Sequence, residues 1–146
     1  MRLSKPVRWM LAGVVAMGVA NTWAASCTVS VIGVNFGVYD VFSNQPDDIS
    51  GAITTSCSSS TSYAISVSTG LGTYAARTLT NGQYTLFYNL FVDSSHTSIW
   101  GDGSSGTATV SSTDTGRTYS VYGRIGARQN AVVGNYSDTV TVTVTY

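Results

Sequence analysis

Residues that carry charge or favour helices are scarce in this chain of 146 residues. It has no glutamate, and its one lysine and three methionines all lie within the first 17 residues. Leucine is also infrequent, so the chain is poor in good helix formers. Valine, threonine, tyrosine and isoleucine, which favour strands, are frequent. The composition therefore predicts an all-β protein.

Basic clusters and metal-ligand clusters are missing as well. After residue 24 the chain carries four arginines and seven aspartates, a net charge of −3. Nucleic-acid binding would need a basic patch, and none is present. A single histidine, His96, and two cysteines cannot build a zinc site, and no phosphate loop or dinucleotide fingerprint occurs. We expect no nucleic-acid partner, no metal and no small-molecule cofactor.

The longest apolar run lies at the start of the chain. Arg2, Lys5 and Arg8 precede an apolar run over 9–20, and a small-x-small pattern ends at Ala24. This arrangement is typical of a secretory signal peptide over 1–24. Cleavage after Ala20 and an uncleaved membrane anchor are the alternatives. The first interpretation leaves a single exported domain, 25–146.

The two cysteines, Cys27 and Cys57, both fall in the exported part. An even pair in an oxidising compartment predicts one disulfide. Lipidation of Cys27 is the competing interpretation, since Ala24 to Cys27 faintly resembles a lipoprotein cleavage box, but it would leave Cys57 unpaired.

The clearest strand signal is the last stretch, 138–146, in which valine and threonine alternate. One face should enter a core, and it consists of Val140, Val142, Val144 and Tyr146. If this strand lies at the margin of a sheet, it leaves open backbone groups beside an apolar surface, and such an edge invites another strand. These four residues are therefore the predicted interface for a partner strand.

Further alternation predicts about seven short strands, which indicates a β-sandwich. The expected strands cover 27–32, 49–57, 63–68, 84–92, 107–112 and 118–125, with renewed alternation over 34–38 and a hairpin at Asn81-Gly82. The segment 84–92 should be a central strand. Core positions are expected for its aromatic residues and for the tryptophan that follows: Tyr84, Phe87, Tyr88, Phe91 and Trp100.

The polar motifs of the chain give weak signals for catalysis and for metal binding. His96 follows Asp93 and two serines, but four polar residues in one turn do not supply a base, an orienting acid and a nucleophile in the required geometry. We therefore expect a loop and no enzyme. One carboxylate, Asp102, in a glycine turn is a weak calcium signal, and 135–137 is a glycosylation sequon by pattern only. Arg124 should pair with an acid such as Asp102 or cover apolar surface with its stem.

Several phrases together resemble the spore coat protein U domain family, which includes the pilins of archaic chaperone–usher systems. They are Phe36-Gly-x-Tyr39, Gly51-x-Ile53 leading to Cys57, Tyr88-Asn-Leu90 before Asp93, Trp100-Gly-Asp-Gly103, Val121-Tyr-Gly-Arg-Ile125 and Gly134-Asn-Tyr-x-Asp138. Gly126 stands where the resemblance would place proline.

The resemblance implies an incomplete immunoglobulin-like sandwich that lacks its last strand. It implies a periplasmic chaperone that lends a strand, an outer-membrane usher, and neighbouring pilin subunits in a surface pilus that supports adhesion and biofilm formation. A donor subunit needs an alternating extension ahead of its first strand, and 21–26 does not alternate. We therefore expect an acceptor without a donor strand, at the tip or in a minor position. The alternative is a non-polymerising secreted coat or ligand-binding module.

Overall fold

The computed structural model describes residues 24–146. The predicted signal segment lies outside the described residues except for Ala24, so the signal peptide and its cleavage site stay predictions. Eight strands form in the described part: β1 Cys27–Ile32, β2 Asp47–Cys57, β3 Thr61–Val67, β4 Arg77–Thr80, β5 Thr85–Phe91, β6 Val110–Asp114, β7 Thr118–Ile125 and β8 Val142–Thr145. No helix in this part of the chain is long and apolar enough to cross a membrane.

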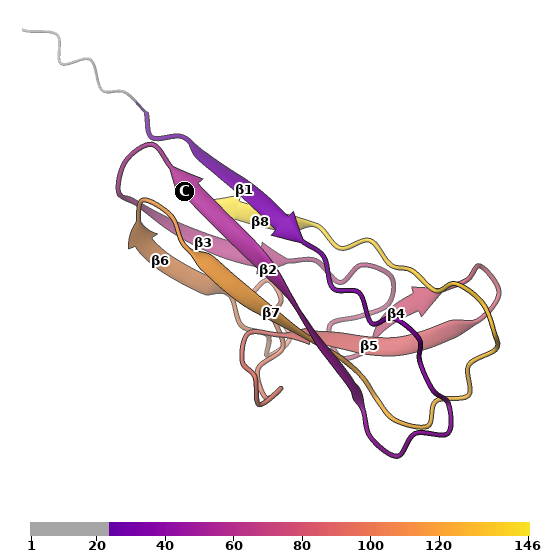
Figure 1. Ribbon diagram of the computed structural model, residues 1–146. Coiled ribbons are helices and arrows are strands. Elements are labelled where there is room, and N and C mark those ends of the chain that lie inside the picture. Colours follow the sequence, from indigo (N-terminus) through magenta and orange to yellow (C-terminus); the bar gives the residue numbers. More distant parts are fainter. Residues whose placement is uncertain (1–23) are drawn as a thin grey trace, which may run out of the picture.

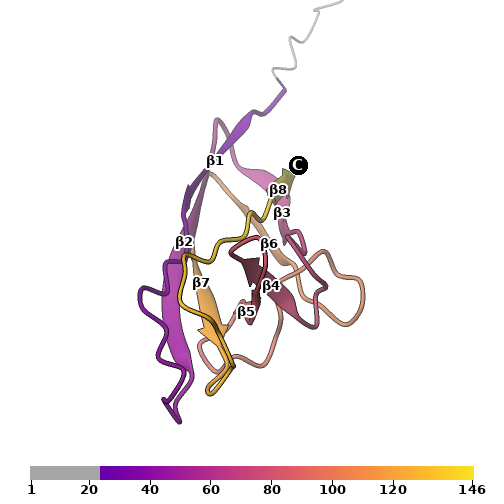
Figure 2. The ribbon, with the colours of Figure 1, turned by 90° about the vertical axis from the view of Figure 1, so that its right-hand side faces the viewer.

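The strands form two sheets that face each other (Figures 1 and 2). The larger sheet has the order β1-β2-β7-β5-β4, and the smaller one β6-β3-β8. All strand pairs are antiparallel. The predicted all-β sandwich is confirmed, and alternation within the strands explains it, because each strand sends every second side chain into the space between the sheets.

The core lies between the sheets. It is built from alternate residues of β2, β3, β5 and β7 together with one tryptophan, and its least exposed members are Ile53, Ile65, Val67, Trp100 and Ile125. Trp100 is fully buried, and its indole Nε1 donates to the carbonyl of Ile65 at 3.1 Å. Because β3 belongs to the smaller sheet, this tryptophan anchors that sheet to the loop that follows β5.

The disulfide between Cys27 and Cys57 joins β1 to β2, which confirms the predicted pairing. The two residues lie directly opposite each other in the register, with Cα atoms 4.0 Å apart. Such a short separation is typical of a non-hydrogen-bonded antiparallel pair. The lipidated alternative is not compatible with this bond.

The segment after β1 departs from the prediction, since 34–38 forms no strand. Val34 and Phe36 instead turn toward the inner face of the larger sheet. Added Cβ atoms at Gly51 and Gly123 would lie 3.1 and 2.7 Å from methyl groups of Val34. Two glycines on neighbouring strands thus leave room for this segment to pack against the sheet. The alternation of apolar residues over 34–38 is the same in a packed irregular segment as in a strand, so the sequence alone could not distinguish the two.

Two of the expected core aromatics are exposed. Leu86, Tyr88 and Leu90 of β5 face the core, whereas Tyr84 and Phe87 are 43 % and 53 % exposed. Phe87 has the opposite parity to the core residues, so the strand presents it to the outer face. The strand itself is central as predicted, between β4 and β7, and the hairpin at Asn81-Gly82 joins it to β4.

Candidate functional site

The strand β8 lies at a free edge of the smaller sheet, where its only partner among residues 24–146 is β3. In the register, Val142 lies opposite Val67 and Val144 opposite Ile65. The carbonyl of Thr141 accepts from the amide of Ser68 at 2.9 Å, so 141, 143 and 145 direct their backbone groups toward β3. By alternation, the N–H and C=O groups of Val142 and Val144 point away from β3, to the open side.

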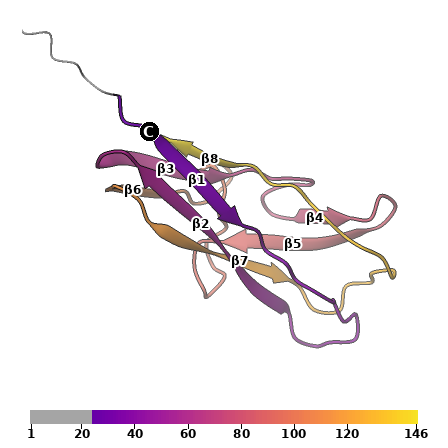
Figure 3. The same cartoon turned by 45° about the horizontal axis from the view of Figure 1, so that its top comes forward.

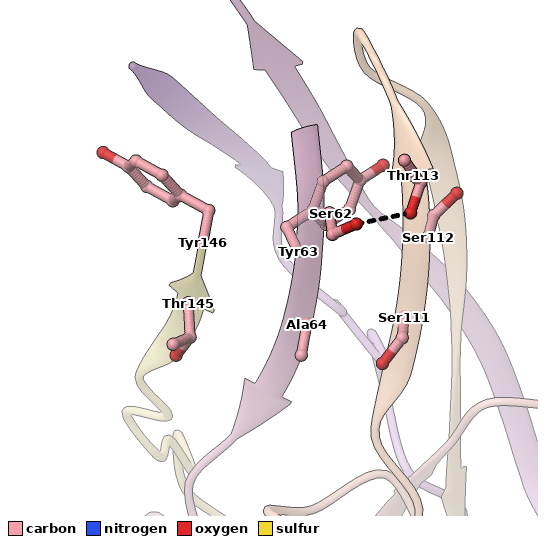
Figure 4. Close-up of a pocket in the computed structure, with 8 residues that line it drawn as sticks. All are labelled: Ser62, Tyr63, Ala64, Ser111, Ser112, Thr113, Thr145 and Tyr146. Atoms are coloured by element: carbon pink, nitrogen blue, oxygen red, sulfur yellow. Dashed lines mark hydrogen bonds between the residues drawn. The ribbon is translucent and has the colours of Figure 1, made fainter. Parts of the chain in front are cut away.

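The four predicted interface residues are placed differently from one another. Val142 and Val144 lie in β8, partly buried against the core, and Val140 is partly buried just before the strand. Tyr146 lies after the strand and is 58 % exposed. Figure 4 shows its ring turned away from β3 and Thr145 beside Ala64.

The predicted strand over 138–146 is wrong in its first half, because the chain is still attached to the other sheet there. Ser137 exchanges backbone hydrogen bonds with Thr80 of β4, at 3.0 and 2.9 Å. Only at Thr141, where the amide donates to Ser68 Oγ at 2.8 Å, has the chain reached the smaller sheet. A segment that changes sheets cannot continue one ladder, although its alternation is unbroken.

The strand β1 forms a second free edge, in the larger sheet, since β2 is its only partner within the part of the chain that the structure describes. The amide of Ser58 donates to the carbonyl of Ser26, so the backbone groups of Val29 and Val31 point away from β2 by the same alternation. Val29 and Val31 share the inner face with Cys27, yet they are 42 % and 50 % exposed. Their direct partners on β2, Thr55 and Ile53, are only 2 % and 1 % exposed.

These two edges lie along the same side of the sandwich, in different sheets, and their arrows run in opposite directions (Figures 1 and 3). We call β1 and β8 the open edges, defined by Val29, Val31, Val142 and Val144. Each offers inward-facing valines and unpaired backbone groups on the same residues. An extended segment placed between them would run antiparallel to one edge and parallel to the other. It could hydrogen-bond both edges while covering the valines.

The outer face of the smaller sheet is hydroxylic. A hollow of about 600 Å³ there is lined mainly by serine and threonine hydroxyls of β3, β6 and β8, with Tyr146 at its margin (Figure 4). Ser62 and Thr113 hydrogen-bond each other across it at 2.7 Å. Hydroxyls that satisfy one another keep an uncharged sheet face compatible with water.

A tyrosine cluster ties the two sheets together. The Tyr63 hydroxyl of β3 contacts Thr55 of β2 at 3.0 Å, Tyr119 of β7 at 2.8 Å and Asp114 of β6 at 2.8 Å. Burial raises the pKa of Tyr63 to about 12. Hydrogen bonds from Ser112 and Tyr63 lower the pKa of the Asp114 carboxyl. Tyr63 therefore stays protonated and Asp114 stays charged over the physiological range.

The predicted loop at His96 is confirmed. The Asp93 carboxylate accepts bonds from Ser95 Oγ and from the amides of Thr97 and Ser98, and these lower the pKa of Asp93. His96 packs edge-on against Phe91 and Tyr122. The carboxylate therefore shapes its own turn and does not orient the imidazole for catalysis.

Arg124 pairs with an acid, but the acid is Asp48 and not Asp102. Its Nε and Nη2 donate to the two carboxylate oxygens of Asp48, each at 2.6 Å, and the residues are direct partners across β2 and β7. The hydrogen bonds from Arg124 lower the pKa of the Asp48 carboxyl. Asp102 instead accepts from the amide and hydroxyl of Ser104. Within residues 24–146, no group of three or more His, Cys, Asp or Glu side chains could hold a metal ion.

Sequence reasoning missed a buried polar centre around Arg77. Its side chain is fully buried, and it donates to the carbonyl of Ser68 at 2.9 Å, the carbonyl of Trp100 at 2.7 Å and Asn89 Oδ1 at 2.5 Å. Asn89 in turn donates to the carbonyl of Tyr74. The alternation of β5 gave one usable signal, since Asn89 interrupts an otherwise apolar strand.

The chain resembles one known family and solved structures of pilus subunits. The family model of the Spore Coat Protein U domain matches residues 14–143, while a comparison with curated proteins gives no match. A similar fold occurs in the crystal structure of the CsuC–CsuE chaperone–tip adhesion subunit pre-assembly complex from archaic chaperone–usher Csu pili of Acinetobacter baumannii. That match has a TM-score of 0.63 and 27 % identity, and it covers 84 % of this chain and 40 % of the other.

The Escherichia coli Hda pilus minor tip subunit HdaB also matches, with a TM-score of 0.45 and 13 % identity, over 80 % of this chain and 79 % of that chain. The chain thus spans 40 % of the length of the Csu chain that it matches. The pilin-like β-sandwich with one disulfide agrees with the family match, and the chain belongs to the Spore Coat Protein U domain family.

Proposed function

We propose that this protein is a structural subunit of a chaperone–usher surface pilus and that it accepts a β-strand from a partner between its open edges. One observation carries the proposal: among the described residues, β1 and β8 both lack a second neighbour, and inward-facing valines of β1 remain about half exposed. Sandwich cores normally bury such residues. Membership of the Spore Coat Protein U domain family supports the same conclusion.

The proposed partners act in sequence. A periplasmic chaperone supplies a strand to the open edges first, an outer-membrane usher receives the complex, and a neighbouring subunit then replaces the chaperone strand. Val140, Val142, Val144 and Tyr146 contribute the β8 side of this interface. The assembled subunit stands at the cell surface, where the pilus supports adhesion and biofilm formation.

The position in the pilus is a finer part of the proposal. Under either proposed cleavage site, the residues ahead of Cys27 do not alternate over 21–26, and a donated strand requires alternation. We infer an acceptor that occupies the tip or a minor position. Purified chain that polymerises with itself, without any other subunit, would contradict this part only.

The experiment is co-purification of the exported chain with a periplasmic chaperone of an archaic chaperone–usher system. Val31→Asp and Val144→Asp place a charge on each open edge and should abolish capture, because an inserted strand would bury that charge. Val133→Asp is the matched control, since Val133 is fully exposed on the loop before β8. It should be captured like the unchanged chain.

The contrary outcome is a chain that folds stably alone and ignores the chaperone. That result would favour the non-polymerising secreted coat or binding module. Equal loss of capture in Val133→Asp and Val144→Asp would show that the assay responds to charge in general and not to the open edges.

A further inference from the structure

The sequence of β8 does not by itself define its register on β3. Threonine and valine alternate without interruption from Thr139 to Thr145. A shift by one residue would turn the threonines inward and is strongly disfavoured. A shift by two residues that brings Val140 opposite Val67 replaces each valine by a valine and each threonine by a threonine, so the side-chain pattern tolerates it. The opposite shift brings Tyr146 opposite Ile65.

The far end of the strand does not resolve this ambiguity. β8 contributes four paired residues, and the described chain provides a neighbour on one side of it only. Tyr146 follows the last pair, is 58 % exposed, and turns away from β3 (Figure 4). The register must therefore be fixed from the other end, where the chain arrives from the larger sheet.

Asp138 is the side chain that holds that end. One carboxylate oxygen accepts from the amide of Leu71 at 2.9 Å and from the amide of Thr139 at 2.7 Å, and the other accepts from the Tyr88 hydroxyl at 2.6 Å. Tyr88 is 7 % exposed and belongs to the core. Gly70 has a φ of +60°, and a Cβ there would lie 2.2 Å from the carboxylate. The loop after β3 is thus shaped closely around this one group.

The backbone leaves little slack on either side of Asp138. Ser137 is bonded to Thr80 of β4, and Thr141 is bonded to Ser68 at the end of β3. Only three residues separate these two attachments. A two-residue shift toward one end would leave a single residue to cross between sheets, and a shift toward the other would insert two extra residues into the crossing. Either shift would therefore move the backbone at Asp138 and disturb the hydrogen bonds of its carboxylate.

We propose that Asp138 sets the register of β8 and is thereby a positioning residue of the strand-acceptor edge. Its anchor selects the observed register over the shifted register that the Thr-Val repeat also permits. The consequence for assembly rests on the proposed function: a two-residue shift displaces the β8 edge by about 6.6 Å along the sheet. In the shifted register that the repeat tolerates, Val140 and Val142 would take the places of Val142 and Val144 on the acceptor edge, and Val144 would lie opposite Tyr63.

Cysteine pairs can report the register in the full exported chain. Ser66 and Thr143 are direct partners on the outer face, and the spacing of such pairs permits a disulfide. Ser66→Cys is combined with Thr143→Cys for the observed register, or with Thr141→Cys or Thr145→Cys for the two shifted ones. Cross-linked peptides are then quantified by mass spectrometry, with Asp138 unchanged or replaced.

In the unchanged chain, the 66–143 pair should dominate. Asp138→Ala removes three hydrogen bonds to a charged group, so the shifted pairs should rise by roughly tenfold or more relative to 66–143. Asp138→Asn should restore the original pattern largely, because its amide oxygen can still accept from the two backbone amides. Asp93→Ala, which removes a similarly bonded carboxylate from the loop after β5, should leave the pattern unchanged.

A wild-type cross-linking pattern in Asp138→Ala would overturn the proposal. If that variant does not fold, Tyr88→Phe decides the matter, since it removes one of the three bonds and keeps the ring. Shifted pairs above the wild-type level would then support the proposal, and a wild-type pattern would overturn it. The assay contains no partner strand, so a chain that accepts none would still report its register, and the two proposals can fail separately.

Discussion

At the scale of single residues, the few charged side chains of this protein include several that make specific contacts. The Asp48–Arg124 pair is bidentate, spans two neighbouring strands and is partly exposed, with 39 % and 37 % of the side chains accessible. Solvent screening limits the contribution of such a pair. Its geometry nevertheless fixes the register of β2 against β7 near one end of the strands.

Asp48→Asn should lower the free energy of unfolding by about 0.5–1 kcal/mol at pH 7. Because the folded state lowers the pKa of Asp48, its contribution is present above the pKa of the unfolded chain and is lost as pH falls. Urea denaturation at pH 7 and pH 3 should therefore show a difference between variant and unchanged chain that shrinks in acid.

Asp47 is the matched control for that comparison. Burial and the neighbouring Asp48 raise the pKa of Asp47, so its charge opposes folding at neutral pH. Asp47→Asn should leave stability unchanged or raise it slightly. A loss at pH 7 as large as that of Asp48→Asn would mean that the Arg124 pairing is not the source of the effect.

Arg77 presents the opposite case, a fully buried charge held by carbonyl and amide oxygens. Arg77→Met should cost about 3–5 kcal/mol, since it leaves the buried carbonyls of Ser68 and Trp100 without donors. Arg117→Met serves as control, because that side chain is 64 % exposed, and it should change stability by no more than about 0.5 kcal/mol. Urea midpoints measure both, and similar costs for the two variants would contradict the assigned role of Arg77.

At the scale of elements, β1 should behave unlike the strand it pairs with. Val31 and Ile53 are direct partners, yet they are 50 % and 1 % exposed. In the isolated chain, Val31→Ser should cost less than about 1 kcal/mol, because much of its surface is already in water. Ile53→Ser should cost about 3 kcal/mol or more, through lost packing and a buried hydroxyl. Equal costs would show that the β1 edge is covered.

Alternation of apolar and polar residues predicted the strands that stay in one sheet, beside the same neighbouring strands, along their whole length. β1 and β7 have the predicted bounds, and β2 begins two residues earlier than expected. Prediction failed where a segment leaves its sheet: 34–38 packs onto glycines of β2 and β7, and 137–141 passes from β4 to β3. Local periodicity reports which side chains share a face, and it does not report which sheet provides that face.

The strand that the sequence did not reveal, β4, has a weak local signal. β4, Arg77–Thr80, contains a single large apolar residue, Leu79, and its first residue is a buried arginine. Its strand character comes from pairing with β5 through the Asn81-Gly82 hairpin, which was predicted, and from the side-chain network of Arg77. The β8 half of the open edges was predicted by residue, whereas the β1 half became visible only through exposed side chains.

At the scale of the whole molecule, the open edges leave apolar surface uncovered in a chain with few surface charges. An additional strand should therefore stabilise the entire sandwich and not only its edge. A tail fused after Tyr146 through a short turn would run antiparallel to β8 and parallel to β1. With valines at alternate positions it would place apolar side chains beside Val29, Val31, Val142 and Val144.

Such a fused strand should raise the free energy of unfolding by about 2–5 kcal/mol. Each covered apolar side chain contributes about 1.5–3 kcal/mol, and backbone hydrogen bonds add to this, while ordering the tail offsets much of the gain. Urea unfolding measures the change. A tail of equal length with serine and asparagine at the valine positions is the control and should add little. In the fused chain Val31→Ser should become markedly more costly than in the unfused one, because the tail buries that valine. If both tails act alike and the cost of Val31→Ser does not grow, the strand is not being received between β1 and β8.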